Sequence, residues 1–220
     1  MILQNFAVIE GCDGSGTTTQ LHLLEKQLCA RIKPEKGQIS GFHITNEPTR
    51  GPIGRIIRSI LMGEVSVQKE TLARLFAADR GEHLYAPDGI IARCSRNELV
   101  VSDRYTPSSL VYQGLECGRK LPETLNGSFP NPEILIYLDV DPNTAMDRIC
   151  RRNKKAELYD QEIFQAKVRD AYLELLPKYQ SEGVTVSVLD GTLPPGELSG
   201  EIWRILEKMP IMDIIRADIE

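Results

Sequence analysis

A glycine-rich turn close to the N-terminus combines residue types that suit phosphate binding. Gly11 and Gly16 match the two glycines of the pattern G-x-x-x-x-G-K-[ST], and Thr18 matches its hydroxyl residue. Glycines let backbone N–H groups approach a phosphate, and the hydroxyl suits a magnesium ion. Thr17 stands where the pattern has lysine, so its charged residue is missing. The spacing predicts a phosphate-binding loop of reduced positive charge, with a merely tight strand-to-helix turn as the alternative.

Two further groups of charged residues suit the same chemistry. Asp103 and Arg104 follow an apolar run, and the basic run 148–155 contains Arg148, Arg151 and Arg152 as well as two lysines. Phosphoryl transfer depends on positioning and electrostatic clamping more than on covalent chemistry. A phosphate loop, an Asp-Arg pair and a basic segment are the parts that this reaction needs. The basic run could equally be a solvated surface patch.

The elements that must position these residues alternate between strands and helices. Short apolar runs predict strands at 6–9, 42–46, 98–105, 133–140 and 184–189. Helical spacing predicts helices at 17–32, 53–62, most of 67–97, from 108 onward, and at 143–150, 161–182 and 198–207. The passage 118–132 is predicted to be mostly loop. Because alternation implies parallel crossover units, we expect one α/β domain over 1–220, with three layers (α/β/α) around a five-stranded parallel sheet.

Composition narrows the class of protein. The 220 residues carry a formal net charge of -5 and are 41% hydrophobic, which fits one packed domain and argues against a nucleic-acid or anionic-membrane surface. The five cysteines are scattered without a C-x-x-C pair, so neither a disulfide framework nor a zinc site is expected. No apolar run is long enough to span a bilayer, and no secretory signal precedes the first strand. We expect a cytoplasmic protein with no nucleic-acid or membrane partner.

Five ordered segments carry a resemblance to a known family. They read E-G-C-D-G-S-G-x-T-T-Q, E-P-T-R-G-P-I-G, L-F-A-A-D-R, D-R-Y-x-x-S-S-L-x-Y-Q-G and Y-L-D-V-D-P. In this order and spacing the chain resembles the thymidylate kinase family over nearly its whole length. The resemblance implies a P-loop fold with a helical lid at about 148–160. It also implies transfer of the γ-phosphoryl group of ATP to dTMP, with Mg2+ as cofactor and a homodimer as the assembly.

On the donor side, the resemblance implies ATP contacts along the whole glycine-rich loop. These residues are Gly11, Cys12, Asp13, Gly14, Ser15, Gly16, Thr17, Thr18 and Thr19. Thr18 and Asp103 are the implied magnesium residues, and the implied catalytic set is Asp103, Arg104, Arg151 and Arg152. Relatives have either an arginine in the loop or a glycine there with arginines in the lid, and Gly14 places this chain with the second kind. For Glu10 two roles stay open, a catalytic one and that of a solvated acid beside the metal.

On the acceptor side, the resemblance implies a pocket for the thymine base, the sugar and the 5′-phosphate. Phe76 would stack on thymine, which suits an aromatic ring, and Tyr105 would lie beneath the deoxyribose. Arg58 and Arg104 would hold the 5′-phosphate through their planar guanidinium groups. The full implied set is Asp13, Arg50, Arg58, Phe76, Arg80, Arg104, Tyr105, Ser109 and Gln113.

The missing loop lysine leaves three functions in play. The first is thymidylate kinase; the second is a kinase for another pyrimidine monophosphate or a deoxynucleoside; the third is a catalytically silent nucleotide-binding homologue. Losing a hydrogen bond to a charged group costs about 1.5–3 kcal/mol, roughly ten- to a hundred-fold in rate. Because lid cations, Mg2+ and loop N–H groups could offset that cost, we expect an active enzyme in which Arg151 or Arg152 supplies the charge that Thr17 lacks.

Overall fold

A five-stranded sheet forms the centre of the molecule. The computed structural model describes residues 1–31, 41–151, 159 and 162–216. The strands lie in the order β2-β3-β1-β4-β5, and every neighbouring pair is parallel. They are β1 (Ile2–Gly11), β2 (Gly41–Asn46), β3 (Glu98–Asp103), β4 (Asn131–Asp139) and β5 (Thr185–Asp190). The predicted parallel sheet is confirmed, and β1, which leads into the glycine-rich turn, occupies its middle.

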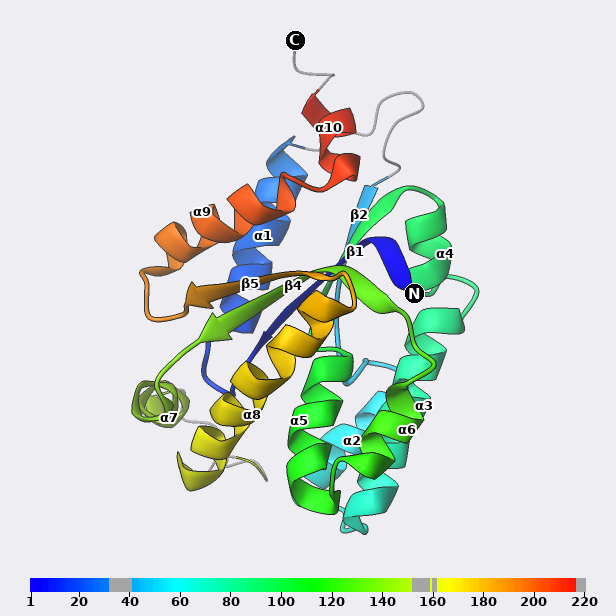
Figure 1. Cartoon of the computed structure of the whole chain (residues 1–220), viewed down its shortest axis with the longest axis vertical. Coiled ribbons are helices and arrows are strands. Elements are labelled where there is room, and N and C mark those ends of the chain that lie inside the picture. Colours follow the sequence, from blue (N-terminus) through cyan, green and yellow to red (C-terminus); the bar gives the residue numbers. More distant parts are fainter. Residues whose placement is uncertain (32–40, 152–158, 160–161, 217–220) are drawn as a thin grey trace.

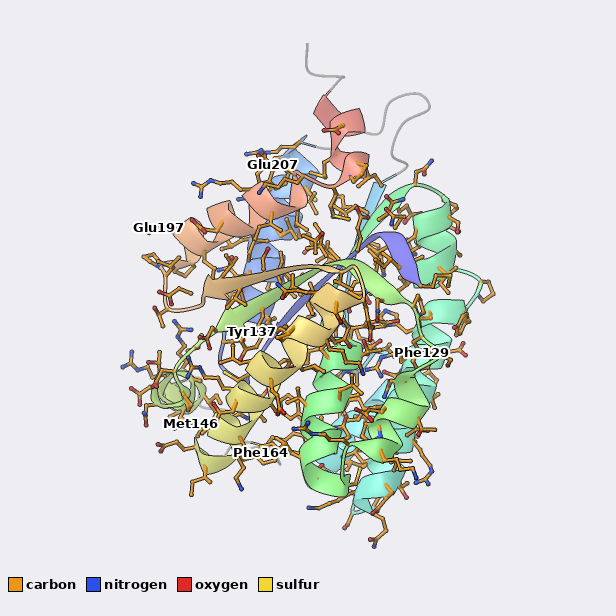
Figure 2. The ribbon with its side chains drawn as sticks, in the orientation of Figure 1. Phe129, Tyr137, Met146, Phe164, Glu197 and Glu207 are labelled. Atoms are coloured by element: carbon orange, nitrogen blue, oxygen red, sulfur yellow. The ribbon has the colours of Figure 1, made fainter. Side chains whose placement is uncertain are left out.

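Helices cover both faces of this sheet, which gives three layers (Figure 1). On one face lie α1 (Thr17–Arg31), α9 (Pro195–Leu206) and α10 (Pro210–Arg216), and on the other lie α5 (Thr106–Cys117) and α8 (Glu162–Ser181). Ala7 and Ile9 of β1 pack with the first group, whereas Phe6 and Val8 pack with the second. Figure 2 shows Tyr137 of β4 beside α8, and the centroid of its ring lies 4.9 Å from that of Tyr172 in this helix. Burial on both faces explains the continuous apolar run of β1.

Five further helices lie in the described part of the chain. They are α2 (Pro52–Leu61), α3 (Lys69–Tyr85), α4 (Ile90–Ser95), α6 (Lys120–Asn126) and α7 (Pro142–Arg151). Helix α2 packs on α3 through a small cluster that includes Ile57, Ile60 and Leu72. None of the described helices is both long and apolar enough to cross a membrane.

Helix α6 falls inside the passage that the sequence predicted to be mostly loop. Positions 121, 122, 125 and 126 face inward or are half-buried, and they recur at helical spacing. Two of them are Pro122 and Asn126, which hide the periodicity because neither reads as a core residue. Proline is tolerated there because it lies in the first turn of the helix.

The predicted lid at about 148–160 is described only at its ends. Arg148 and Arg151 belong to the last turn of α7, and Tyr159 is buried, with its ring stacked 5.2 Å from that of Phe164. The positions 152–158 and 160, which include Arg152, lie outside the described residues. The predicted helical lid therefore remains a prediction.

Candidate functional site

The glycine-rich turn connects β1 to the first residue of α1. Gly14 and Gly16 have φ angles of 83° and 101°, which residues with a side chain rarely adopt. A Cβ atom on Gly14 would lie 2.4 Å from the carbonyl oxygen of Ala145 in α7, so glycine is required at this position. Thr17 begins α1 and is buried. The N–H groups and the dipole at a helix start favour an anion at this turn.

Thr18 and Asp103 bring oxygen atoms together next to the loop. The Thr18 hydroxyl donates to Asp103 Oδ2 at 3.1 Å, while the buried Asp103 Oδ1 meets no donor among the described residues. Burial raises the pKa of Asp103, against the effects of Arg104 and the threonine hydroxyls of the loop. An unpartnered carboxylate oxygen suits Mg2+, which usually takes one or two carboxylates and completes its shell with water and phosphate oxygens.

No larger metal cluster competes with this pair in the described part of the chain. There, no group of three His, Cys, Asp or Glu side chains is arranged to hold a metal ion. Mg2+ is usually bound through one or two protein groups together with substrate phosphates, and Thr18 and Asp103 fit that mode of binding.

A cavity that is partly open to solvent lies beside the turn. Its walls come from the glycine-rich turn, the loop after β2, α3, α5 and Tyr159. The lining includes these predicted acceptor residues: Asp13, Phe76, Arg80, Arg104, Tyr105, Ser109 and Gln113. Segments far apart in the sequence thus meet at this cavity.

Arg104 lines the cavity and contacts the glycine-rich turn. Its φ of 71° turns the chain out of the sheet, which is why β3 ends at Asp103 and not at 105 as predicted. Arg104 Nη2 donates to Asp13 Oδ1 at 2.6 Å, and Nη1 donates to Ser108 Oγ at 3.1 Å. The guanidinium also lies over the ring of Tyr112, 5.1 Å from its centroid. Because Asp13 belongs to the glycine-rich turn, this ion pair ties the phosphate loop to the cavity wall.

Glu10 lies behind this corner and is fully buried. Its Oε1 accepts from the backbone N–H groups of Tyr105 and Ser108 at 2.9 and 3.3 Å. Its Oε2 accepts from the hydroxyls of Ser108 and Tyr172 at 2.7 and 2.8 Å. Burial raises the pKa of Glu10 to about 7, although Arg104 and these hydrogen bonds act in the opposite direction. The role of a solvated acid is wrong for this residue; it holds the turn that presents Arg104.

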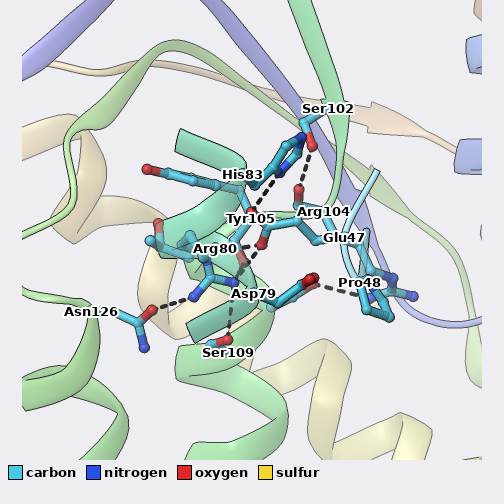
Figure 3. Close-up of polar contacts among 12 residues, drawn as sticks. Glu47, Pro48, Asp79, Arg80, His83, Ser102, Arg104, Tyr105, Ser109 and Asn126 are labelled. Carbon is cyan, nitrogen blue, oxygen red and sulfur yellow. Dashed lines mark hydrogen bonds and ion pairs between the residues drawn. The ribbon is translucent and has the colours of Figure 1, made fainter. Parts of the chain in front are cut away.

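Arg80 forms part of the cavity wall and is itself surrounded by acceptors (Figure 3). Its Nε and Nη2 donate to Glu47 Oε2 at 2.9 and 2.7 Å. Nη2 also donates to the carbonyl oxygen of Tyr105 and to Ser109 Oγ, and Nη1 donates to Asn126 Oδ1. A buried charge needs this degree of pairing, so Arg80 fixes the relative positions of the loop after β2, α5 and α6.

Two predicted phosphate-binding arginines do not line the cavity. Arg58 donates to the carbonyl oxygens of Pro48 and Thr49, and Asp79 accepts from the N–H and the hydroxyl of Thr49, each at 2.6 Å. The side chain of Arg50 is exposed. The structure thus places Arg58 behind the loop whose Pro48 reaches the cavity.

The predicted base and sugar residues have different degrees of exposure. Phe76 is half-buried on α3 and presents its ring to the cavity. Tyr105 is fully buried, with its ring edge-on to Phe6 at 5.1 Å and its hydroxyl donating to the carbonyl oxygen of Pro130. Ser109 and Gln113 lie one turn apart on the cavity face of α5. This arrangement leaves Phe76 as the more accessible aromatic surface.

Gln165 is a site residue that the sequence reasoning missed. It is fully buried on α8; its Nε2 donates to Asp13 Oδ2 at 3.0 Å and its Oε1 accepts from Asp13 N–H at 3.2 Å. Nε2 also donates to the carbonyl oxygen of Tyr159. A signal existed, because Gln165 precedes Val168 and Tyr172 at helical spacing on a buried face. A polar residue on such a face indicates a specific partner.

The two described arginines of the basic run lie in different surroundings. Arg148 Nη1 donates to the carbonyl oxygen of Gly191 at 3.0 Å and lies 3.4 Å from the carbonyl oxygens of Gly14 and Ser15. Arg151 is exposed at the end of α7. Of these two arginines, only Arg148 contacts the glycine-rich turn within the described part of the chain.

Comparison with known proteins gives one consistent family. A family model described as thymidylate kinase matches residues 9–201. A putative thymidylate kinase of Treponema pallidum is 41% identical over 177 residues, which cover 80% of this chain and 81% of that protein. A probable thymidylate kinase of Pyrobaculum aerophilum is 37% identical over 205 residues, which cover 93% and 97%. One of Methanococcus maripaludis is 37% identical over 97% of this chain and its own full length.

Proposed function

The chain belongs to the thymidylate kinase family, and on this basis we propose that it transfers the γ-phosphoryl group of ATP to dTMP. The observation that carries the proposal is the 2.6 Å ion pair between Arg104 and Asp13. It keeps an arginine of the acceptor cavity in contact with the phosphate loop. Phosphoryl transfer requires the two phosphates to be held close and in line, and this pair supports that placement.

In the proposed acceptor complex, dTMP occupies the cavity with its phosphate toward Arg104. The guanidinium fork of Arg104 suits phosphate oxygens, and Asp13 accepts from the sugar 3′-hydroxyl. Phe76 stacks on the thymine ring, a contact worth about 1–3 kcal/mol for an exposed aromatic surface. Arg80, Ser109 and Gln113 complete the base pocket, and Tyr105 lies under the sugar. Arg50 and Arg58 act from outside the cavity, Arg58 by fixing the loop at 48–49.

In the proposed donor complex, the ATP phosphates lie on the N–H groups of the glycine-rich turn. Thr18 and Asp103 are the residues that would hold Mg2+, which when bound neutralises charge on the β- and γ-phosphates. An oxygen of the acceptor phosphate forms a bond to the γ-phosphorus as the bond to the β–γ bridging oxygen breaks, which leaves ADP and dTDP. The acceptor phosphate is largely ionised near neutral pH, so no general base has to remove a proton.

An assay of ADP release with several acceptors tests the proposal. The acceptors are dTMP, dUMP, dCMP, UMP and thymidine, each with ATP and magnesium. We expect the highest kcat/KM with dTMP and no turnover with thymidine, because Arg104 needs a phosphate partner. Preference for another monophosphate, or phosphorylation of thymidine, would support the second function that the sequence left open. An Arg204→Ala variant, changed at an exposed ion pair on α9, is the matched control.

Thr17 favours a second candidate, a nucleotide-binding protein without catalysis. In that case calorimetry detects binding of ATP and dTMP, the wild-type protein forms no dTDP, and Thr17→Lys restores turnover. Turnover by the wild-type protein would exclude this candidate.

We also propose a homodimer and a cytoplasmic location. Ile56, Met62 and Val65 expose apolar surface on and after α2, and apolar patches of this kind suit a subunit contact. The five cysteines are unpaired, which suits a reducing compartment. Light scattering of the wild type and an Ile56→Glu variant tests the assembly, with a dimer expected for the first and a monomer for the second.

A further inference from the structure

Arg148 occupies a place from which it can replace the charge that Thr17 does not provide. Its guanidinium lies against the carbonyl oxygens of Gly14 and Ser15, both in the glycine-rich turn. We propose that Arg148 is a positioning residue for the donor phosphates and acts on them through the backbone of the turn. This inference rests on the proposed function, because it concerns the ATP half of the same site.

The orientation of the peptide units explains how the charge would act. The carbonyl of Gly14 belongs to the same peptide unit as the N–H of Ser15, and the carbonyl of Ser15 belongs with the N–H of Gly16. A cation at the carbonyl side polarises the unit and strengthens the N–H as a donor on the other side. The Ser15 N–H already bonds to the carbonyl of Cys12 at 3.1 Å. Among the described residues no acceptor meets the N–H of Gly16, which leaves it available for a phosphate oxygen.

Gly14 makes this contact possible. The ideal Cβ position at Gly14 lies 2.4 Å from the carbonyl oxygen of Ala145, so a side chain there would push α7 away from the turn. Ala145 is fully buried and stands one turn before Arg148. A third contact, from Arg148 Nη1 to the carbonyl oxygen of Gly191, fixes the guanidinium from the side of β5. The close approach of α7 that Gly14 allows therefore also brings Arg148 to the glycine-rich turn.

A structural reading of Arg148 makes different predictions. If Arg148 only fastens α7 to the loops after β1 and β5, its replacement lowers stability, and any change in nucleotide affinity is the same for every nucleotide and for either residue at position 17. If Arg148 supplies charge, its replacement lowers the affinity for a nucleotide more when the nucleotide has more phosphates. In that case a lysine at position 17 makes Arg148 dispensable. The proposal therefore requires that the charge of Arg148, and not only its hydrogen bonds, affects ATP affinity.

Binding measurements on the full chain separate the two readings. Arg148→Gln removes the charge and retains a shorter side chain with amide N–H donors. Arg148→Lys keeps the charge. We expect calorimetry to show about ten-fold weaker ATP binding for Arg148→Gln, a smaller loss for AMP, and unchanged dTMP binding. Arg148→Lys should retain most of the ATP affinity, and Thr17→Lys combined with Arg148→Gln should recover it.

The proposal is overturned if Arg148→Gln binds ATP as the wild type does, if AMP loses as much affinity as ATP, or if the loss is unchanged in the Thr17→Lys background. Arg204→Ala serves as the control arginine, and thermal unfolding without ligand monitors stability. If Arg148→Gln does not fold, Arg148→Lys and Arg148→Met compared by ATP-induced stabilisation give the same test, and equal stabilisation contradicts the proposal. These readouts need no turnover, so a failure of the dTMP kinase activity would be seen separately.

Discussion

The carboxylates of Asp103 and Glu10 suit different roles because their surroundings differ. Asp103 has one oxygen bonded to Thr18 and one without a partner among the described residues, and it lies next to the phosphate loop. Glu10 has both oxygens occupied by hydrogen-bond donors and no exposure to solvent. A carboxylate with a free oxygen suits a metal, whereas a saturated one suits the support of its neighbours. We therefore propose that Asp103 takes part in the reaction, and that Glu10 belongs to the framework that presents Arg104.

Replacing Asp103 by asparagine should impair turnover more than acceptor binding. We expect kcat to fall by about 100-fold or more, the scale seen when one preorganised group is lost from a transition-state site. The magnesium concentration for half-maximal activity should rise, because one charged ligand is lost. Steady-state kinetics with a magnesium titration measure both effects. Asp88→Asn, which alters an exposed surface pair, should behave as the wild type; an Asp103→Asn protein that needs no more magnesium would contradict the assignment.

Glu10 makes the stability of the protein depend on pH. Its pKa of about 7 in the folded protein exceeds the ordinary value of 4.5, so the folded state holds a proton that the unfolded chain has released between these values. Protonated Glu10 therefore contributes to the free energy of unfolding in full below pH 4.5, and this contribution is lost as the pH rises to 7. It amounts to about 3 kcal/mol for a fully buried group.

Glu10→Gln should remove this pH dependence. The hydroxyls of Ser108 and Tyr172 can accept from the new amide, so the variant keeps its contacts. Urea unfolding at pH 5 and pH 8 compares the two proteins. The wild type should lose stability relative to Glu10→Gln as the pH rises, whereas Glu64→Gln, changed at an exposed acid, should follow the wild type. A constant difference between wild type and Glu10→Gln at both pH values would refute the account of Glu10.

At the scale of elements, the joints between strands and helices determine the site. The turn between β1 and α1 passes under α7 because Gly14 has no side chain, and the turn between β3 and α5 leaves the sheet at Arg104. Helix α8 reaches both the loop and the cavity through Gln165. Each of these three places positions one residue of the candidate site, and changes there should act on catalysis as well as on folding.

Gly14→Ala should separate α7 from the phosphate loop. The new Cβ would meet the carbonyl oxygen of Ala145, and the alanine would have to adopt a φ near 83°. We expect a loss of about 1–3 kcal/mol of stability and weaker ATP binding. Gly63→Ala is the matched control, because its φ is 73° but nothing lies within 4 Å of its Cβ position. That control should lose about 1 kcal/mol with ATP binding intact; equal effects of both changes on ATP binding would argue against the contact.

Gln165→Leu should release Asp13 and lower acceptor turnover. The change removes a donor to the Asp13 carboxylate and an acceptor for its N–H. We expect kcat/KM for dTMP to fall by about ten- to a hundred-fold, as for a lost hydrogen bond to a charged group. Gln180→Leu changes an exposed glutamine of the same helix and should leave kcat/KM unchanged. A Gln165→Leu protein with wild-type kinetics would show that Asp13 holds its place without Gln165.

The elements that the sequence revealed and those that it concealed differ in a physical way. The strand β1 and the helix α1 were predicted because uninterrupted apolar residues and then a clear helical spacing mark them. Helix α6 was missed because half of its inward positions carry proline and asparagine. The partner of Asn126 is Arg80, 46 positions away, and no local pattern contains that information. The resemblance named Arg58 as a site residue, but only the fold places it behind the loop at 48–49.

At the scale of the whole molecule, the parallel sheet brings the donor and acceptor parts to one edge. The ends of β1, β3 and β4 lead into the glycine-rich turn, the Arg104 corner and α7, and the turn after β5 reaches Arg148 through Gly191 (Figure 1). Ligands of open α/β sheets bind outside these strand ends. Because the Arg104–Asp13 pair spans the two parts, we infer that they work as one site for two phosphorylated ligands.

Direct detection of dTDP from ATP, dTMP and magnesium tests this central claim. Product is measured by chromatography for the wild type, Asp103→Asn and Thr17→Lys at equal protein concentration. We expect the wild type to form dTDP well above the Asp103→Asn protein, and Thr17→Lys to be faster than the wild type by no more than about a hundred-fold, the range for one hydrogen bond to a charged group. No dTDP from the wild type above the Asp103→Asn background would contradict the claim that these residues form a thymidylate kinase site.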